Sequence, residues 1–242
     1  SCNNKLKKIF FLSEGQEWED ILVQNCREKK IQTIAYLNSF IKYWDCNYYK
    51  YKNKKLFPLP DKFLVESYHN KRKLIKAGIP LGKIKKIKTS KFKINKKKTT
   101  NLNLNKINIL VLLSFIKSET VELIELVKKV SKDKPNFKFY LKYHPANQHN
   151  FNNDKSSNIL KYLKKNIEFN KFDYAIVAND SAASIDCYLN GLKFFIYRPK
   201  NKLNNNFLFE YNKNIFFSNP NILVNKLISK KHKILKFSKI VI

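Results

Sequence analysis

The sequence contains no methionine, and arginine occurs at only three positions, Arg27, Arg72 and Arg198. Because a chain without methionine does not begin at its own initiator residue, we expect a fragment or a processed product. Because arginine is rare, the positive charges behind the formal net charge of +31 are almost all lysines. Proteins that read nucleic-acid bases use arginine forks and aromatic platforms, and the sequence clusters neither. No nucleic-acid partner is therefore expected.

The lysine excess accompanies a heavy use of asparagine and isoleucine, which is typical of genomes rich in A and T. On this interpretation the lysines occupy a solvated surface, which also allows peripheral contact with an anionic membrane. One alternative is a non-enzymatic, lysine-rich module that binds nucleic acid or anionic lipid. Such a module would bind phosphates with an affinity that falls steeply with salt.

Cysteine is also scarce. Cys2, Cys26, Cys46 and Cys187 form no CxxC pair and have no histidines at zinc-ligand intervals, so no metal site is expected. This usage favours a reduced, cytoplasmic setting. The sequence has no apolar run as long as a bilayer span and no signal-peptide pattern at its start. We therefore expect a cytoplasmic protein, free or held peripherally at the inner face of the membrane.

What the chain does contain is enough apolar residues, 43%, to fill one large α/β domain or two small ones. Residues 1–88 carry the signals of a β-α-β unit, whose crossover makes the strands parallel. The expected helix would bury Trp18, Ile21, Leu22 and Cys26 on one face. The elements expected in this lobe are strands at 8–12, 31–37 and 62–66 and helices at 17–30 and 68–77.

Residues 89–106 are almost wholly Lys, Asn and Thr and are predicted to link two lobes. Residues 107–242 then alternate strands with helices, which predicts a doubly wound parallel sheet with its ligand crevice at the carboxyl ends of the strands. Ser118 is expected to cap the first of these helices. The expected strands are 107–113, 137–143, 173–178 and 194–197, and the expected helices are 118–130, 159–165, 181–189 and 222–229.

One candidate site lies where a buried strand passes into a helix, at Asn179, Asp180 and Ser181. Free backbone N–H groups at a helix start favour a phosphate, and small residues at 182 and 183 would let a ligand approach. Ser181 and Ser184 add hydroxyl donors. The alternative is that Asp180 or Ser181 only caps the helix, a role that these residue types often fill.

A second candidate is His144, which ends the preceding strand and is followed by Pro145. A histidine fixed in this position can place an imidazole beside a phosphate. His149 is interpreted as a loop residue.

The third candidate is Glu14, in the Ser-Glu-Gly turn that follows the first strand. A carboxylate that faces a cleft can have a raised pKa and act as a general base. The alternative is a carboxylate that caps the next helix, and Glu17 and Glu19 fit that description equally well.

Together these motifs resemble those of the bacterial sialyltransferases and Kdo transferases of the GT-B fold. The resemblance rests on the acidic-Gly turn at Glu14, the His-Pro pair at His144 and the serine-containing helix start at Ser181 and Ser184. The first lobe is also similar to surface carbohydrate biosynthesis proteins. That similarity lies in residues 14–19 (EGQEWE), 43–48 (YWDCNY) and 59–61 (LPD).

The resemblance implies two Rossmann-like lobes with parallel sheets, the N-terminal one on the acceptor side and incomplete, since it is shorter than such lobes usually are. It also implies transfer of an acidic sugar, a nonulosonic acid or Kdo, from a CMP-activated donor to a cell-surface glycan or glycolipid. The enzyme would be inverting and independent of metal or other cofactors. Implied roles are the acceptor base for Glu14, phosphate contacts for His144, Ser181 and Ser184, and ribose binding for Asp186.

Two further observations bear on this expectation. Residues 35–38 (AYLN) stand where the carbohydrate biosynthesis proteins have a histidine, so the acceptor site is expected to differ. CDP-glycerol glycerophosphotransferases and UDP-sugar 2-epimerases also resemble the C-terminal lobe, with a His-Pro turn and a Ser-rich helix start. A different GT-B activity on a CDP- or UDP-linked substrate is therefore the nearest alternative.

Overall fold

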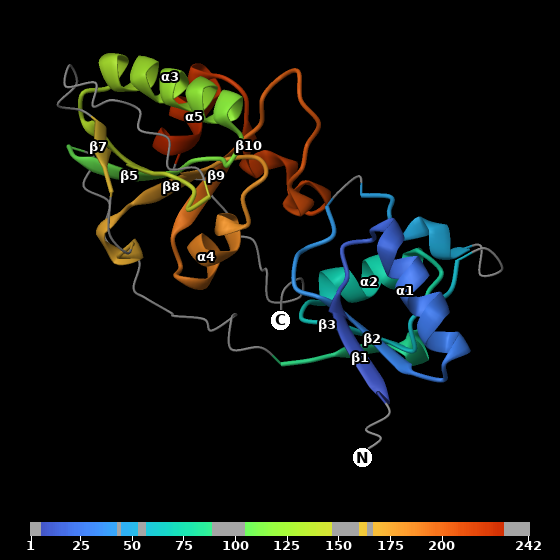
Figure 1. The fold of residues 1–242 in the computed structure, drawn as a ribbon. Coiled ribbons are helices and arrows are strands. Elements are labelled where there is room, and N and C mark those ends of the chain that lie inside the picture. The colour runs from blue at the N-terminus through green and yellow to red at the C-terminus, as the bar shows by residue number, and fades with distance from the viewer. Residues whose placement is uncertain are drawn as a thin grey trace. The chain divides into compact units, whose positions relative to one another are not determined.

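The computed structural model describes residues 6–42, 45–52, 57–88, 105–146, 160–163 and 167–229. The chain divides into two compact units, residues 1–92 with 236–242 and residues 93–235, each built on its own parallel sheet (Figure 1). The division falls within the segment predicted as a linker. Most of that segment, together with Tyr43, Trp44 and His149, lies outside the described residues.

The first lobe has a four-stranded sheet in the order β1-β2-β3-β4, and each neighbouring pair is parallel. The predicted β-α-β unit is therefore confirmed. Strand β4 was not predicted, because a run of three residues that includes two lysines carries no strand signal. The elements are β1 (Lys8–Leu12), α1 (Glu17–Glu28), β2 (Gln32–Leu37), β3 (Lys62–Val65), α2 (Tyr68–Lys76) and β4 (Ile84–Lys86).

The predicted buried face of α1 is partly wrong. Trp18 and Ile21 are 51% and 64% exposed, whereas the helix buries Glu19, Val23 and Cys26. The first buried residue of α1 is Glu19, because its carboxylate accepts hydrogen bonds from the turn that precedes the helix. A prediction from the spacing of apolar residues does not count a buried glutamate, so it assigned the wrong residues to the buried face of the helix.

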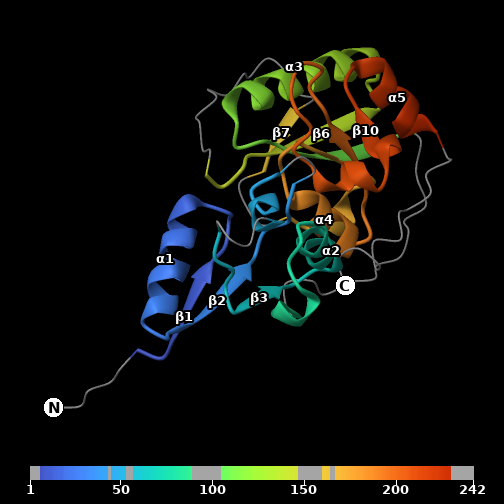
Figure 2. The same cartoon turned by 90° about the vertical axis from the view of Figure 1, so that its right-hand side faces the viewer.

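The second lobe has a six-stranded parallel sheet in the order β10-β9-β8-β5-β6-β7. Helices α3 and α5 cover one face of this sheet and α4 covers the other, which confirms the doubly wound prediction (Figures 1 and 2). The strands are β5 (Ile107–Leu112), β6 (Phe137–Lys142), β7 (Leu160–Tyr162), β8 (Tyr174–Val177), β9 (Lys193–Tyr197) and β10 (Phe216–Phe217), and the helices are α3 (Lys117–Asp133), α4 (Ala183–Leu189) and α5 (Pro220–Ile228).

The core of this lobe lies between α3, α5 and the sheet. Side chains such as Leu123 and Val127 of α3 and Leu223 of α5 pack on Ile109 and Val111 of β5, and all five are fully buried. The burial of β5 on both faces matches its continuous apolar sequence. No helix in the described part of the chain is long and apolar enough to cross a membrane.

Three local predictions for this lobe are corrected. The helix expected at 159–165 is wrong, since residues 160–162 form β7 and pair with β6; a short apolar run does not distinguish the two structures. Strand β10 was missed. Ser118 is not the helix cap, because α3 begins at Lys117, and the Ser118 Oγ instead accepts a hydrogen bond of 3.0 Å from Lys202 Nζ.

Candidate functional site

The second sheet has a topological switch point between β5 and β8. From β5 the chain adds β6 and β7 on one side, and then returns to add β8, β9 and β10 on the other. In open parallel sheets ligands bind at the carboxyl ends of the strands at such a point. The residues that follow β5, β6 and β8 include Ser114, His144 and Asn179, so two of the predicted site positions and one new one flank this point.

Asn179 is held in place by hydrogen bonds within the second lobe. Its backbone N–H donates to Glu119 Oε1 at 2.7 Å and its Nδ2 donates to the Leu203 carbonyl at 2.9 Å. The side chain is 2% exposed, and its Oδ1 has no hydrogen-bond partner in the described part of the chain. Asn179 therefore holds the loop after β8 to α3 and to the segment around residue 203.

Asp180 connects the ends of β8 and β5. Its Oδ1 accepts a hydrogen bond of 2.8 Å from Ser114 Oγ, which also accepts the N–H of Ile116 at 2.9 Å. The other oxygen, Oδ2, is buried and lacks a partner among the described residues. The two strand ends are thus tied together by side chains that are 66 positions apart in the sequence.

The two serines behave differently from each other. Ser181 is partly exposed, and its Oγ accepts the N–H of Ala183, the first residue of α4, at 3.2 Å. This contact fits the alternative in which Ser181 serves the start of the helix. Ser184 is fully buried, and its Oγ has no partner among the described residues. Asp186, the predicted ribose ligand, is exposed on α4.

His144 is partly exposed after β6, and Pro145 beside it is exposed. The N–H of Ala146 donates to His144 Nδ1 at 3.2 Å. Because Nδ1 accepts this hydrogen bond, the ring proton is on Nε2, which leaves Nε2–H as the donor for a ligand. The ring lies 5.9 Å from the ring of Phe115, which follows β5 and is half exposed. His144 and the end of β5 are thus neighbours.

Glu119 was not predicted as a site residue. It lies in the first turn of α3 but is only 1% exposed, and burial together with the nearby Asp180 carboxylate raises its pKa to about 7. The Asn179 N–H, Lys202 and Ser114 act in the opposite direction. An acidic residue in the first turn of a helix is usually solvated, so the sequence carried no signal of this burial.

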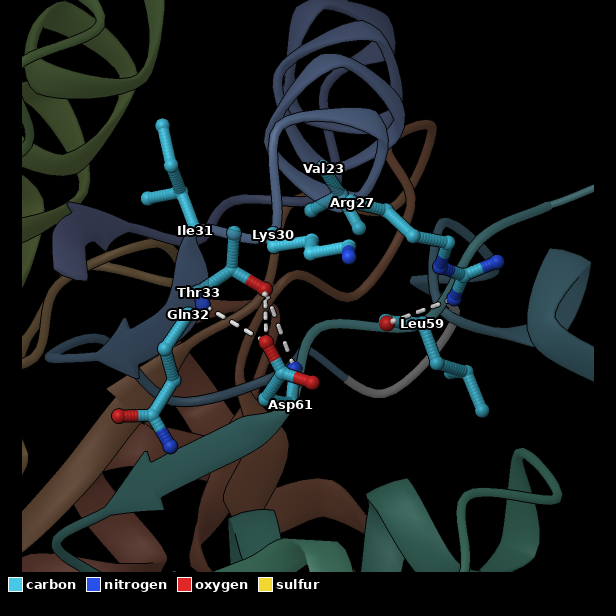
Figure 3. A pocket seen from close by; sticks show the side chains of 8 residues that line it. All are labelled: Val23, Arg27, Lys30, Ile31, Gln32, Thr33, Leu59 and Asp61. Atoms are coloured by element: carbon cyan, nitrogen blue, oxygen red, sulfur yellow. Dashed lines mark hydrogen bonds between the residues drawn. The ribbon is translucent and has the colours of Figure 1, made fainter. Parts of the chain in front are cut away.

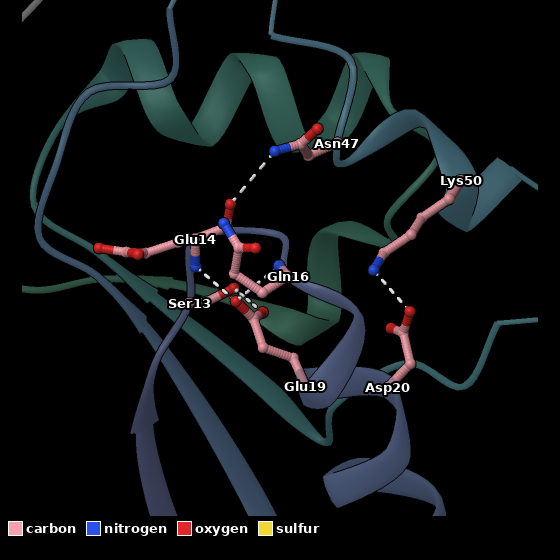
Figure 4. A network of polar contacts seen from close by, with 7 residues as sticks. All are labelled: Ser13, Glu14, Gln16, Glu19, Asp20, Asn47 and Lys50. Carbon is pink, nitrogen blue, oxygen red and sulfur yellow. Dashed lines mark hydrogen bonds and ion pairs between the residues drawn. The ribbon is translucent and has the colours of Figure 1, made fainter.

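In the first lobe, Glu19 and not Glu14 is the capping carboxylate (Figure 4). Glu19 is 1% exposed and accepts three hydrogen bonds, from Ser13 Oγ at 2.8 Å, from the Glu14 N–H at 2.6 Å and from the Gln16 N–H at 3.0 Å. The Glu14 side chain is exposed and points away from this network (Figure 4). Of the three glutamates that the sequence offered as the cap, Glu19 is therefore the one that fills this role.

The turn that carries Glu14 is rigidly built. Gly15 has a φ of +77°, and a Cβ at this position would lie 2.5 Å from Asn47 Cβ. The hydroxyl of Tyr48 donates to the Ser13 carbonyl at 2.9 Å. Residues 47 and 48 therefore close over the turn and fix the backbone from which Glu14 projects.

A further pair at the carboxyl ends of this sheet was missed. Tyr36, near the end of β2, donates its hydroxyl to Glu66, which directly follows β3. Glu66 is 8% exposed, and burial together with this hydrogen bond and charge raises the pKa of Tyr36 to about 12. The position of Glu66 as the last residue of a strand predicted at 62–66 was the available signal. Tyr36 stands in the segment 35–38 where a histidine was expected.

Comparison with known proteins identifies the fold. No protein-family model matches the chain, and a comparison with curated proteins finds no match. Similar solved structures are UDP-N-acetylglucosamine 2-epimerase from Rickettsia bellii (15% identity, TM-score 0.57, 95% of this chain and 67% of that one) and the glycotransferase of kitacinnamycin (8%, 0.60, 93% and 67%). A third is Anabaena HepE in complex with UDP and glucose (13%, 0.52, 92% and 69%).

These similarities show that the chain has the α/β GT-B-like fold of two lobes, each with a parallel sheet, as the sequence predicted. The chain spans about two thirds of the length of the solved structures that it resembles. At these identities the fold is shared, and the chemistry has to be argued from the site.

Proposed function

We propose that the chain is a nucleotide-sugar enzyme, and specifically a glycosyltransferase whose second lobe binds the nucleotide. The observation that carries this proposal is the convergence of His144, Ser114 and the 179–181 loop at the switch point of a GT-B-like lobe. The names of the similar structures support it, since they include a UDP-sugar epimerase, a glycotransferase and a complex with UDP and glucose.

In this proposal the Nε2–H of His144 donates to a phosphate of the bound nucleotide. Ser181 and the backbone around it contribute further contacts to the phosphate, and the exposed Asp186 binds the ribose. Asn179 and Ser184 are buried and Asp180 is bonded to Ser114, so these side chains would shape the loop rather than meet the ligand directly. Stabilising the phosphate makes the nucleotide a better leaving group, which is the largest contribution that preorganised donors can make.

The acceptor side of the proposal rests on Glu14. Its exposed carboxylate, on a turn fixed by Gly15 and Glu19, would remove the proton from the acceptor hydroxyl as the sugar is transferred with inversion. The finer prediction, an acidic sugar from a CMP-linked donor delivered to a cell-surface glycan, comes from the sequence resemblance. The similar structures favour a UDP-linked donor instead.

Calorimetric titration with UDP and with CMP tests the donor and the site together. We expect His144→Ala to weaken binding of the preferred nucleotide by about 1–3 kcal/mol, the scale of a lost charged hydrogen bond. His144→Gln retains an N–H donor and should recover part of that affinity. Equal affinities for wild type and His144→Ala would refute the phosphate contact. Tighter binding of UDP than of CMP would refute the CMP-linked donor.

The Glu14→Gln variant tests the base. It should bind nucleotide like wild type but release nucleotide from a nucleotide sugar at least about 100-fold more slowly, with water or added glycan as acceptor. Glu17→Gln, an exposed neighbour with the same charge change, is the matched control and should be unaffected. If Glu14→Gln keeps its activity, the base lies elsewhere, and Glu66 at the same sheet edge is the next candidate.

The 2-epimerases among the similar structures favour one second candidate, epimerisation of a UDP-sugar without transfer. Product analysis separates the two activities, because an epimerase yields a new UDP-sugar without free UDP. Binding to DNA or anionic vesicles that collapses with salt and does not require His144 would instead support the non-enzymatic module.

A further inference from the structure

The first lobe has a pocket at the amino ends of β2 and β3, beside the carboxyl end of α1 (Figure 3). Its volume is about 360 Å³, at the lower end of the range typical of small-molecule sites. Glu14 follows β1 at the opposite edge of the same sheet. Since a strand rises about 3.3 Å per residue, the two ends of β2 are roughly 17 Å apart, so this pocket is separate from the predicted base.

The charge of the pocket is mainly positive. Arg27 and Lys30 of the α1 terminus line it, and Asp61 is the carboxylate in its wall. Asp61 is engaged by the lobe itself, because its Oδ2 accepts the Thr33 N–H at 2.8 Å and the Thr33 hydroxyl at 3.1 Å. A third cation, Lys83, lies next to the pocket: burial lowers its pKa, Asp61 opposes this effect and Arg27 adds to it.

Lys30 is held in an unusual backbone conformation. Its φ is +56°, and it is the single non-glycine residue with a positive φ in the described part of the chain. It occupies the position after the helix cap, where the Lys30 N–H donates to the Arg27 carbonyl at 3.1 Å and the Ile31 N–H to the Cys26 carbonyl at 2.8 Å. Glycine is the usual residue here, since it adopts this conformation without steric strain.

The Lys30 side chain points into the pocket, between Thr33 and Arg27 (Figure 3). None of the described residues pairs with its ammonium group, whereas Arg27 Nη2 makes a long contact of 3.4 Å to the Leu59 carbonyl. Because Lys30 is exposed, the missing partner alone indicates nothing, but a strained backbone that directs a lysine side chain into a pocket is the arrangement expected of a ligand contact. A cation near a helix C-terminus also stabilises the helix, so the experiment must distinguish that role of Lys30 from ligand binding.

We propose that this pocket binds a small phosphorylated anion, with Lys30 and Arg27 as its cationic contacts. The ligand chemistry is a phosphate dianion, either free or as the phosphoryl group of a compact sugar phosphate. Arginine supplies paired N–H donors to such a group and lysine a point charge. The pocket does not depend on the proposed function, because no residue of the nucleotide site takes part in it.

Inorganic phosphate is the first probe, titrated at constant ionic strength with chloride as the reference salt. We expect phosphate to raise the melting temperature of wild type and of Lys29→Gln, which loses the same charge one residue earlier. Lys30→Gln should bind phosphate about tenfold more weakly or worse. The titrations are repeated in a His144→Ala background, so that phosphate bound in the second lobe does not contribute. An undiminished response of Lys30→Gln in that background overturns the proposal.

Lys30→Gly separates the ligand from the helix terminus. Because glycine relieves the strain at φ +56°, this variant should melt at a higher temperature than its parent without phosphate. In the His144→Ala background it should bind phosphate as weakly as Lys30→Gln does. A lower melting temperature without phosphate would show that Lys30 serves α1 alone and would overturn the proposal. Glucose 1-phosphate is the second probe: tighter binding than phosphate identifies a sugar phosphate, and equal binding identifies the free anion.

Discussion

Glu119→Gln is expected to stabilise the folded chain at pH 8 and to flatten the pH dependence of its stability. Burial and the Asp180 carboxylate raise the pKa of Glu119 from its ordinary value of 4.5 to about 7. Between these two values the folded state keeps a proton that the unfolded chain releases. Stability therefore falls as pH rises through that window and stays low above it, by roughly 3 kcal/mol in total.

Glutamine keeps the acceptor for the Asn179 N–H and removes the buried charge. Urea unfolding at pH 5, 6, 7 and 8 measures the effect, and the difference between variant and wild type should grow with pH. Glu125→Gln, an exposed position on the same helix, is the matched control and should follow wild type. Parallel curves for Glu119→Gln and wild type across this range would contradict a raised pKa.

Gly15→Ala is expected to destabilise the first lobe by roughly 3 kcal/mol, from the combined strain of a positive φ and of overpacking. Both causes are visible in the structure: φ is +77°, and the new methyl group would lie 2.5 Å from Asn47 Cβ. The measurement is urea unfolding. Gly82→Ala is the matched control, because no atom lies within 4 Å of a Cβ at that position, and its effect should be close to zero.

A double variant separates the two causes. Asn47→Gly removes the clashing Cβ but leaves the backbone of residue 15 in its left-handed conformation. Gly15→Ala should therefore be less destabilising in the Asn47→Gly background than in wild type, with about 1 kcal/mol of backbone strain remaining. An equal loss in both backgrounds would mean that the residue 47 segment does not close over the turn.

The sequence predicted the parts of the fold that depend on local pattern. Apolar runs at residues 8–12 and 107–112 predicted two parallel strands, but the burial expected of the first is wrong, since Phe10 and Leu12 are 64% and 50% exposed. Polar residues directly after strands predicted Glu14, His144 and the 179–181 loop as candidates. Strands β4 and β10 were missed because two or three residues are too few to show a period. They form because a longer neighbour offers them an open edge.

The candidate site was harder to predict, because burial there depends on residues that are distant in the sequence. Glu119 is buried by its contact with residue 179, and Asn179 is in turn bonded to the carbonyl of residue 203. Among the glutamates that follow β1, the cap could be assigned only once three donors were seen to converge on Glu19. Residue type and spacing were the same for the alternatives, and packing decided between them.

The strand orders also have a consequence for how the chain folds during synthesis. In the first sheet each strand joins the edge left by the previous one, and in the second β5 forms the centre, to which later strands add on either side. Among the strands in the described part of the chain, none has to insert between two that are already paired. However, β5 is apolar on both faces and keeps one unpaired edge until β8 emerges, more than sixty residues later. A nascent chain halted before β8 has been synthesised would expose an unpaired, aggregation-prone strand edge. We therefore expect chaperones to bind the chain mainly at this stage of synthesis.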